Sequence, residues 1–307
     1  GGGGNPRGDS VLPGEPKEFE YHLGNDESAG VGEFKIAQVN SVDKNCPIHL
    51  KLRWPHGGNG TSKNFEKVAA LLLEDGSGLE RVSKLSVTGY LGDEGSSGMQ
   101  ALVDLISKAK ILGDLELSFL QKMSAPILEG LPVGLQELTL TMMTLDEKTK
   151  DALVGFVSRS GGTLEKLSMS YCDIGDELLG KVVGAIVNAR NPVLKHMSLL
   201  VAEISDAAPI VQLLQGSAPI QKLYLTGNEF NADAAREIAG ALAECSTLEE
   251  LNMSNNKMGK TGTDAIIAAA TSSTSLTYVQ LYKTGLSKAQ IGKVEASLPA
   301  KPKFDIM

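Results

Sequence analysis

A short apolar phrase that recurs eight times constrains the fold of this chain more than any other feature. Each copy has an apolar residue at its first, fourth and sixth positions, and successive copies begin between 23 and 30 residues apart. The copies are Val82/Leu85/Val87, Leu112/Leu115/Leu117, Leu135/Leu138/Leu140, Leu164/Leu167/Met169, Leu194/Met197/Leu199, Ile220/Leu223/Leu225, Leu248/Leu251/Met253 and Leu276/Val279/Leu281. Self-similarity at such a period predicts stacked structural repeats.

A second apolar pattern follows the phrase. Six copies have an apolar residue at the eleventh position, and five then carry two apolar residues four apart, as in Val182/Ile186 and Ile238/Leu242. Residues at this spacing lie on the same face of an α-helix. Each repeat is therefore predicted to be a short strand followed by a helix that faces inward.

The ninth position of the phrase is Cys172, Asn228, Asn256 or Thr284 in four copies. A polar side chain here is expected to hydrogen-bond to backbone groups inside the turn, where buried polar atoms need partners. The phrase LxxLxLxxN, seen at 248–256, resembles that of leucine-rich-repeat proteins, and the periods near 28 residues are similar to the ribonuclease-inhibitor-like class. The resemblance implies an α/β fold: a right-handed solenoid, or horseshoe, with a parallel concave sheet and convex helices.

The N-terminal part of the chain lacks the phrase. Residues 1–33 are rich in Gly, Pro and charged residues, which predicts a flexible head with too little apolar surface to order. Residues 34–81 are expected to form an N-terminal capping region. This region shows alternating strand patterns over 34–40 and 48–54, and the apolar spacing from Phe65 to Leu72 predicts a helix.

The remaining chain is assigned to the repeats and their C-terminal end. Eight leucine-rich repeats are expected to fill residues 82–300, because stacked units complete one another's apolar core. Residues 301–307 form a C-terminal tail that, together with a helix from Lys288 to Leu298, is expected to close the last repeat.

Charge and cysteine content narrow the functional classes. There are 29 Lys+Arg against 37 Asp+Glu, so the chain is acidic, which argues against a nucleic-acid-binding surface. No uncharged apolar run reaches the roughly 18 residues that a membrane-spanning helix needs. Cys46, Cys172 and Cys245 lie far apart without a CxxC pair, which favours a reducing, cytoplasmic setting. A removed signal peptide would leave no trace in the sequence.

Short motifs with catalytic associations do not form a site. The Gly8-Asp9-Ser10 segment lies in the polar head, which offers no scaffold for a nucleophile. The Gly259-Lys260-Thr261 segment has Ser254 where a phosphate-binding loop requires its first glycine. The four histidines show no metal-ligand spacing. We therefore predict a protein that is not an enzyme, with no catalytic residues, metal ligands or cofactors.

The candidate binding surface is the face of the sheet that points away from the leucine core. Side chains alternate along a strand, so the third, fifth and seventh positions of each phrase project there. Tyrosine is favoured in interface hot spots, and three of the six tyrosines project from the last repeats. An alternative is that two of them only shield the last strand. The predicted protein-binding residues are Tyr224, Tyr278, Tyr282, His196, Leu200, Lys222, Glu250 and Asn252.

These features predict a non-enzymatic adaptor or scaffold subunit that recognises a protein partner, rather than nucleic acid or membrane, through the concave face. One alternative is a GTPase-activating or other regulatory protein that resembles the Ran GTPase-activating proteins. Such a role would use an exposed Asn or Arg, but the six arginines fall in the head, cap or helical returns. A second alternative is a secreted leucine-rich-repeat effector or surface protein.

Overall fold

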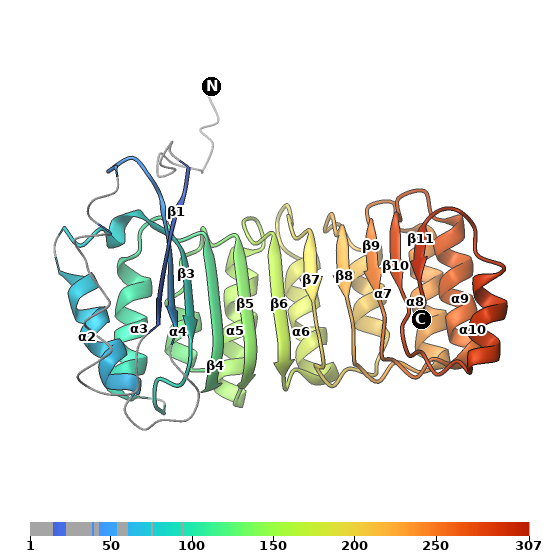
Figure 1. Ribbon diagram of the computed structural model, residues 1–307, viewed down its shortest axis with the longest axis horizontal. Helices are drawn as coiled ribbons and strands as arrows, with labels where there is room; N and C mark the ends of the chain where they lie inside the picture. The colour runs from blue at the N-terminus through green and yellow to red at the C-terminus, as the bar shows by residue number, and fades with distance from the viewer. Residues whose placement is uncertain are drawn as a thin grey trace. The chain divides into compact units, whose positions relative to one another are not determined.

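Parallel strands alternate with helices along the chain (Figure 1). The computed structural model describes residues 15–22, 39, 43–53, 61–74, 76–93 and 95–306. Contacts divide the chain into two compact units, Gly1–Leu135 and Gln136–Met307. Among the described residues, no helix has the length and apolar character needed to cross a membrane.

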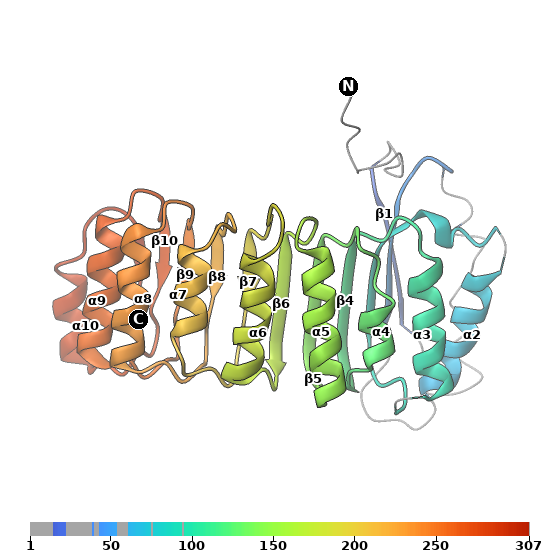
Figure 2. The ribbon, with the colours of Figure 1, turned by 180° about the vertical axis from the view of Figure 1, so that it is seen from behind.

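The first unit contains four strands that lie side by side in chain order. They are β1 (Lys17–His22), β2 (Ile48–Arg53), β3 (Val82–Thr88) and β4 (Asp114–Lys122). The helical segments of this unit are α2 (Thr61–Leu73), η1 (Leu79–Arg81), α3 (Ser97–Lys108) and α4 (Ala125–Glu129). The β1–β2, β2–β3 and β3–β4 pairs are all parallel, as the repeat pattern predicts. In this unit α2, α3 and α4 cover one face of the sheet (Figure 2).

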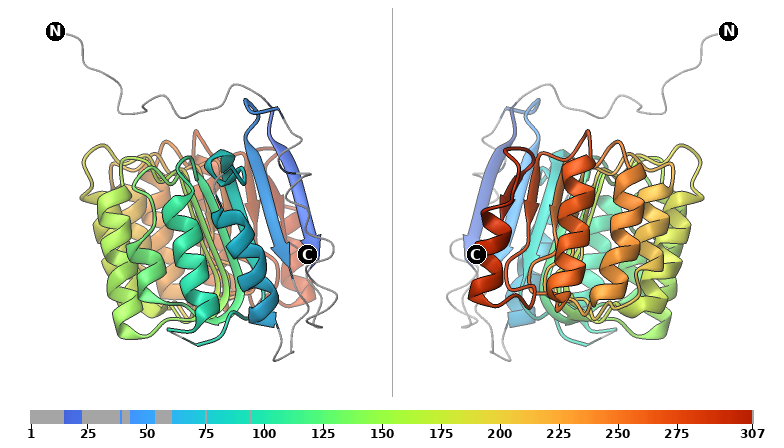
Figure 3. Two further views of the ribbon diagram at one scale, coloured as in Figure 1. Left: turned by 90° about the vertical axis from the view of Figure 1, so that its left-hand side faces the viewer. Right: turned by 90° about the vertical axis from the view of Figure 1, so that its right-hand side faces the viewer.

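The second unit repeats the same arrangement with shorter strands. Its strands are β5 (Glu137–Thr144), β6 (Lys166–Cys172), β7 (His196–Ser198), β8 (Lys222–Tyr224), β9 (Glu250–Asn252), β10 (Tyr278–Gln280) and β11 (Lys303–Asp305). Its helices are α5 (Glu147–Ser160), α6 (Gly175–Val187), α7 (Ala208–Gln215), α8 (Ala232–Glu244), α9 (Gly259–Ser272) and α10 (Lys288–Glu295). These helices also lie on one side of their strands, as the end views show (Figure 3). The other side is the open sheet face.

The core follows the predicted register. Every apolar residue of the eight phrases is buried, with at most 6% of its surface exposed. Four of the five predicted inward-facing helical pairs are buried as well, including Val182/Ile186 in α6 and Ile238/Leu242 in α8. In the fifth pair Leu298 is half-buried, because α10 ends at Glu295 and not at Leu298 as expected. Each repeat thus buries its strand and helix against each other, which confirms an α/β leucine-rich-repeat solenoid.

Asparagine at the ninth position performs its predicted role in the turn. The buried Asn228 side chain donates to the carbonyls of Leu199 (2.7 Å) and Leu225 (3.0 Å) and accepts from the Ala202 amide (3.0 Å). Asn256 repeats this arrangement one repeat later and donates to the Leu225 carbonyl at 2.9 Å. One side chain therefore satisfies backbone groups of two successive repeats.

A flexible head was predicted over residues 1–33, and this prediction is wrong for one segment of it. Lys17–His22 forms β1, which pairs with β2 in parallel register. Within β1, Tyr21 is buried, while Glu18 forms an ion pair with Lys51 at 2.7 Å. The alternating sequence KEFEYH is the signal that the composition of the head obscured. The rest of the head lies outside the described residues.

Two further expectations concern the chain ends. The strand predicted over residues 34–40 lies outside the described residues except for the buried Val39. The tail, expected only to close the last repeat, contributes β11, which pairs with β10, and Ile306 is buried behind it. The tail therefore adds one more strand to the second unit.

Candidate protein-binding surface

The open sheet face of the second unit carries the predicted binding residues. In β8 the burial alternates, so that Leu223 is buried while Lys222 and Tyr224 are half-buried on the open side. Strand pairing aligns His196 with Lys222 and Lys222 with Glu250, and it aligns Tyr224 with Asn252. Neighbouring strands lie about 4.8 Å apart, so these side chains are near neighbours.

Glu250 joins two of the predicted residues. Lys222 Nζ lies 2.8 Å from Glu250 Oε1, and the Tyr224 hydroxyl donates a hydrogen bond to Glu250 Oε2. The Lys222 hydrogen bond, followed by that from Tyr224, holds the pKa of Glu250 below its usual value. Burial, followed by the bond to Glu250, raises the pKa of Tyr224 to about 12. The phenol is therefore protonated and fixed in orientation at neutral pH.

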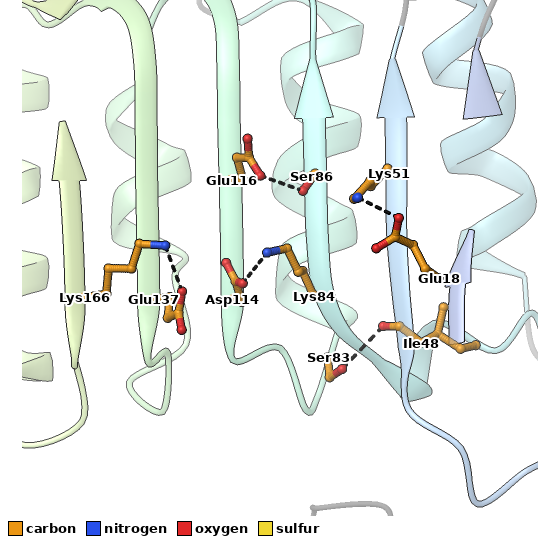
Figure 4. Close-up of polar contacts among 10 residues, drawn as sticks. All are labelled: Glu18, Ile48, Lys51, Ser83, Lys84, Ser86, Asp114, Glu116, Glu137 and Lys166. Atoms are coloured by element: carbon orange, nitrogen blue, oxygen red, sulfur yellow. Dashed lines mark hydrogen bonds and ion pairs between the residues drawn. The ribbon is translucent and has the colours of Figure 1, made fainter. Parts of the chain in front are cut away.

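His196 packs edge-on against Tyr224, with ring centroids 5.0 Å apart and an interplanar angle of 80°. Burial and then the charges of Lys166 and Lys222 lower the pKa of His196 below 6.5. The ring is therefore neutral at pH 7. Its Nε2 atom is buried, with no hydrogen-bond partner among the described residues. Lys166 itself forms an ion pair with Glu137, with 3.1 Å between Nζ and Oε2 (Figure 4).

Tyr278 and Tyr282, the last two tyrosines, interact with residues of β11. The Tyr278 hydroxyl donates to Asp305 Oδ2 at 3.1 Å, and Lys303 Nζ lies 5.8 Å from the centre of the Tyr278 ring. Burial and then this hydrogen bond raise the pKa of Tyr278, and hydrogen bonding to Asp305 raises the pKa of Tyr282. Asp305 and Lys303 were missed by the sequence analysis. The alternation Lys303-Phe304-Asp305 is the signal that would have placed them on a strand.

The other two candidates occupy the middle and the edge of this surface. Asn252 Nδ2 donates to Gln280 Oε1 at 2.6 Å, and Asn252 Oδ1 accepts from the Ser254 amide at 3.0 Å. Leu200 is half-buried two residues beyond β7. The structure therefore brings together a group around Tyr224 and a group around Tyr278, with Leu200 at the edge.

The open sheet face of the first unit has a different character. Lys84 Nζ lies 2.6 Å from Asp114 Oδ2, and Ser86 donates to Glu116 Oε2 at 3.1 Å (Figure 4). Ion pairs between neighbouring strands occur on the open faces of both units, but the tyrosines that hydrogen-bond to carboxylates lie on that of the second. Among the described residues, no group of three His, Cys, Asp or Glu side chains is arranged to hold a metal ion.

Sequence comparisons identify the repeats. The family profile described as "Leucine Rich repeat" matches residues 163–177 and 244–266. The human protein NLRC5 is 24% identical over 106 residues, which are 34% of this chain and 6% of NLRC5. The chain thus spans a small fraction of this relative's length.

A solved structure of another protein shares the architecture. A chain in the crystal structure of the yeast Rad7–Elc1 complex matches with a TM-score of 0.54 and 17% identity, covering 86% of this chain and 63% of that one. A protein from Bacteroides fragilis matches with a TM-score of 0.47 and 14% identity, covering 84% and 74% of the two chains. Together, the repeat register, the paired parallel strands and the profile matches at residues 163–177 and 244–266 show that the chain is built from leucine-rich repeats.

Proposed function

We propose that this chain is a non-enzymatic adaptor or scaffold subunit that binds a protein partner through the open sheet face of its second unit. The observation that carries the proposal is the fixed orientation of Tyr224 and Tyr278. The hydroxyl groups of Tyr224 and Tyr278 are hydrogen-bonded to carboxylates of neighbouring strands, and Tyr282 is half-buried. Rings that are already ordered lose little conformational entropy when a partner covers them.

Several observations support this role. Leucine-rich repeats form a protein-interaction fold, and the yeast chain of similar fold was solved in a complex. The described cysteines, Cys46, Cys172 and Cys245, are all free, which suits a reducing, cytoplasmic setting. Two of the described arginines have structural contacts: Arg81 is buried and donates to the Val39 carbonyl, and Arg236 pairs with Asp233. Arg190 is exposed just beyond α6 and does not lie on a strand. We therefore favour the adaptor role over GTPase activation.

Comparative co-purification tests this proposal. The tagged wild-type chain and a Tyr224→Ala/Tyr282→Ala variant are used to recover proteins from native extract, and the recovered proteins are quantified by mass spectrometry. We expect at least one protein to be recovered with the wild type and depleted with the variant. Tyr224→Phe, which keeps the ring, is the matched control and should retain most of the recovery. Equal recovery by the wild type and the double alanine variant would reject this face as the binding site.

A further inference from the structure

The residue after the seventh position of each repeat adopts a left-handed backbone conformation. These eighth-position residues, with φ between 49° and 132°, are Gly89, Phe119, Met142, Tyr171, Val201, Gly227, Asn255 and Lys283. Their backbone amides extend the hydrogen bonding between neighbouring repeats. Tyr171 N donates to the Leu200 carbonyl at 2.7 Å, and Val201 N donates to the Thr226 carbonyl at 2.9 Å. The conformation is therefore a property of the repeat, while the residue type varies.

Left-handed backbone favours Gly and Asn, and it disfavours bulky and especially β-branched residues. Gly227 and Asn255 follow that preference. Met142, Tyr171 and Val201 do not, although they occupy the same position in three successive repeats of the second unit. Backbone energetics thus select against these side chains.

The same three residues are exposed to solvent. Met142 is 44% exposed, Tyr171 54% and Val201 39%. Strand pairing aligns the residues that flank Met142 with those that flank Tyr171, so the two lie side by side. A Cβ atom added at Gly227 would lie 2.8 Å from Val201 Cγ2, so the valine extends over the next repeat. We call Met142, Tyr171 and Val201 the apolar ridge. Core packing does not account for them, and contiguous exposed apolar residues mark interaction sites.

Negative charge borders the apolar ridge. The segments 142–147, 171–177, 201–206 and 227–233, which lead from the strands towards the following helices, contain no Lys or Arg. Their acidic residues are Asp146, Glu147, Asp173, Asp176, Glu177, Glu203, Asp206, Glu229 and Asp233.

Several of these carboxylates have structural partners within the chain. Asp176, for example, accepts from the Ser205 amide at 2.8 Å, and Glu177 pairs with Lys181 at 2.8 Å. Glu203 and Glu229 are exposed and have no ion pair within the described part of the chain. Their charges remain available to a partner.

We propose that the apolar ridge is a docking site for a basic amphipathic peptide segment of a partner protein. Large apolar side chains of the segment pack on Met142, Tyr171 and Val201, and its Lys or Arg residues lie against Glu203 and Glu229. Electrostatic complementarity of this kind speeds association and excludes acidic partners. The site lies near the carboxyl ends of β5, β6 and β7, whereas the tyrosines of the proposed adaptor surface belong to the last three repeats.

Asparagine substitutions separate docking from a structural role. In Met142→Asn/Tyr171→Asn/Val201→Asn, each position receives the residue type that Asn255 already provides at the same point of its repeat. Because strain is relieved, we expect the thermal unfolding temperature to be unchanged or raised. We expect peptide binding to be lost.

The probe is a random twelve-residue peptide library displayed on phage. It is selected on the immobilised wild-type chain and counter-selected on the triple asparagine variant. Selected peptides should combine Lys or Arg with large apolar residues. By fluorescence anisotropy, their Kd should rise at least tenfold with the triple variant and severalfold with Glu203→Gln/Glu229→Gln. Tyr224→Ala/Tyr282→Ala should bind them like the wild type, so the two proposals stand or fall separately.

Four results would overturn this proposal. The first is that no peptide survives counter-selection, or that the surviving peptides are acidic or lack large apolar residues. The second is that the triple variant unfolds at a clearly lower temperature, which would show a packing role. The third is that the carboxamide variant binds the selected peptides as tightly as the wild type. The fourth is that sedimentation shows a wild-type dimer that the triple variant does not form, which would make a second copy of the chain the occupant.

Discussion

At the scale of the residue, buried side chains in the turns join successive repeats. Asn256 donates to the carbonyls of Leu225 and Met253, both at 2.9 Å, and accepts from the Phe230 amide at 3.2 Å. These backbone groups lie where water does not replace a lost partner. Removing the side chain therefore leaves several of them unpaired, which is costly in a protein interior.

We predict that Asn256→Ala lowers the free energy of unfolding by about 1–3 kcal/mol, the cost of leaving a buried hydrogen-bonding group unsatisfied. Urea denaturation followed by circular dichroism measures the change. The neighbouring Asn255 provides a matched control, because it is exposed and has φ of 57°. Asn255→Gly should change stability much less than Asn256→Ala, because glycine also adopts this left-handed conformation. Equal effects of the two substitutions would refute the structural role of Asn256.

Stability should also depend on the protonation of His196. Burial and the adjacent Lys166 and Lys222 lower its pKa below 6.5, while Glu137 and Glu250 act in the opposite direction. Near pH 6.5, His196 therefore binds a proton more readily in the unfolded chain than in the folded chain. By linkage, the stability associated with His196 is complete above pH 6.5 and declines as the pH falls below that value.

We accordingly predict that the urea concentration at the unfolding midpoint decreases when the pH is lowered from 7.5 to 5.5. In His196→Gln this decrease should be smaller. Denaturation curves of both proteins at the two pH values test the prediction. Titration of the His196 ring protons by NMR should give a pKa below 6.5. An identical fall in the two proteins, or a pKa at or above 6.5, would contradict the account.

At the scale of the element, the recurring phrase was sufficient to predict the strands β3 to β10, because each apolar residue is repeated at the same position many times. β1 and β11 were not predicted as strands. Each is a single short alternating segment, and each depends on pairing with a neighbouring strand. The same limit hid Asp305, since its place beside Tyr278 exists only when the tail forms β11. The apolar ridge was missed because periodicity carries no information on left-handed backbone.

Deleting residues 303–307 tests the role of β11 as an element. Ile306 is buried, and removing such a side chain costs about 1.5–3 kcal/mol in lost burial alone. The deletion also exposes the edge of β10, which favours association between sheet edges. We expect a lower thermal unfolding temperature and increased light scattering. Asp305→Ala, which keeps the strand but removes the acceptor of Tyr278, should show neither large effect.

At the scale of the whole molecule, the two units share one construction and differ in their open sheet faces. Both faces carry ion pairs between neighbouring strands, such as Lys84–Asp114 in the first unit and Lys222–Glu250 in the second. The second unit presents ordered tyrosines and a neutral histidine. Sequence reasoning placed the tyrosines on this face because alternation along a strand is regular. It also predicted Glu250 on this face, but it did not predict the bond from Tyr224 to Glu250 or the position of Asp305, since those contacts come from neighbouring strands. This ordered surface is the basis of the proposed adaptor function.

The most direct test of the central claim is the affinity of the purified chain for the protein that the co-purification identifies, measured by isothermal titration calorimetry. Buried tyrosines in interface hot spots contribute 2 kcal/mol or more, which corresponds to roughly thirtyfold in Kd. We predict that Tyr224→Ala/Tyr282→Ala weakens binding by at least tenfold and that Tyr224→Phe changes it much less. An unchanged Kd for the double alanine variant, with its fold intact by circular dichroism, would contradict recognition through this face.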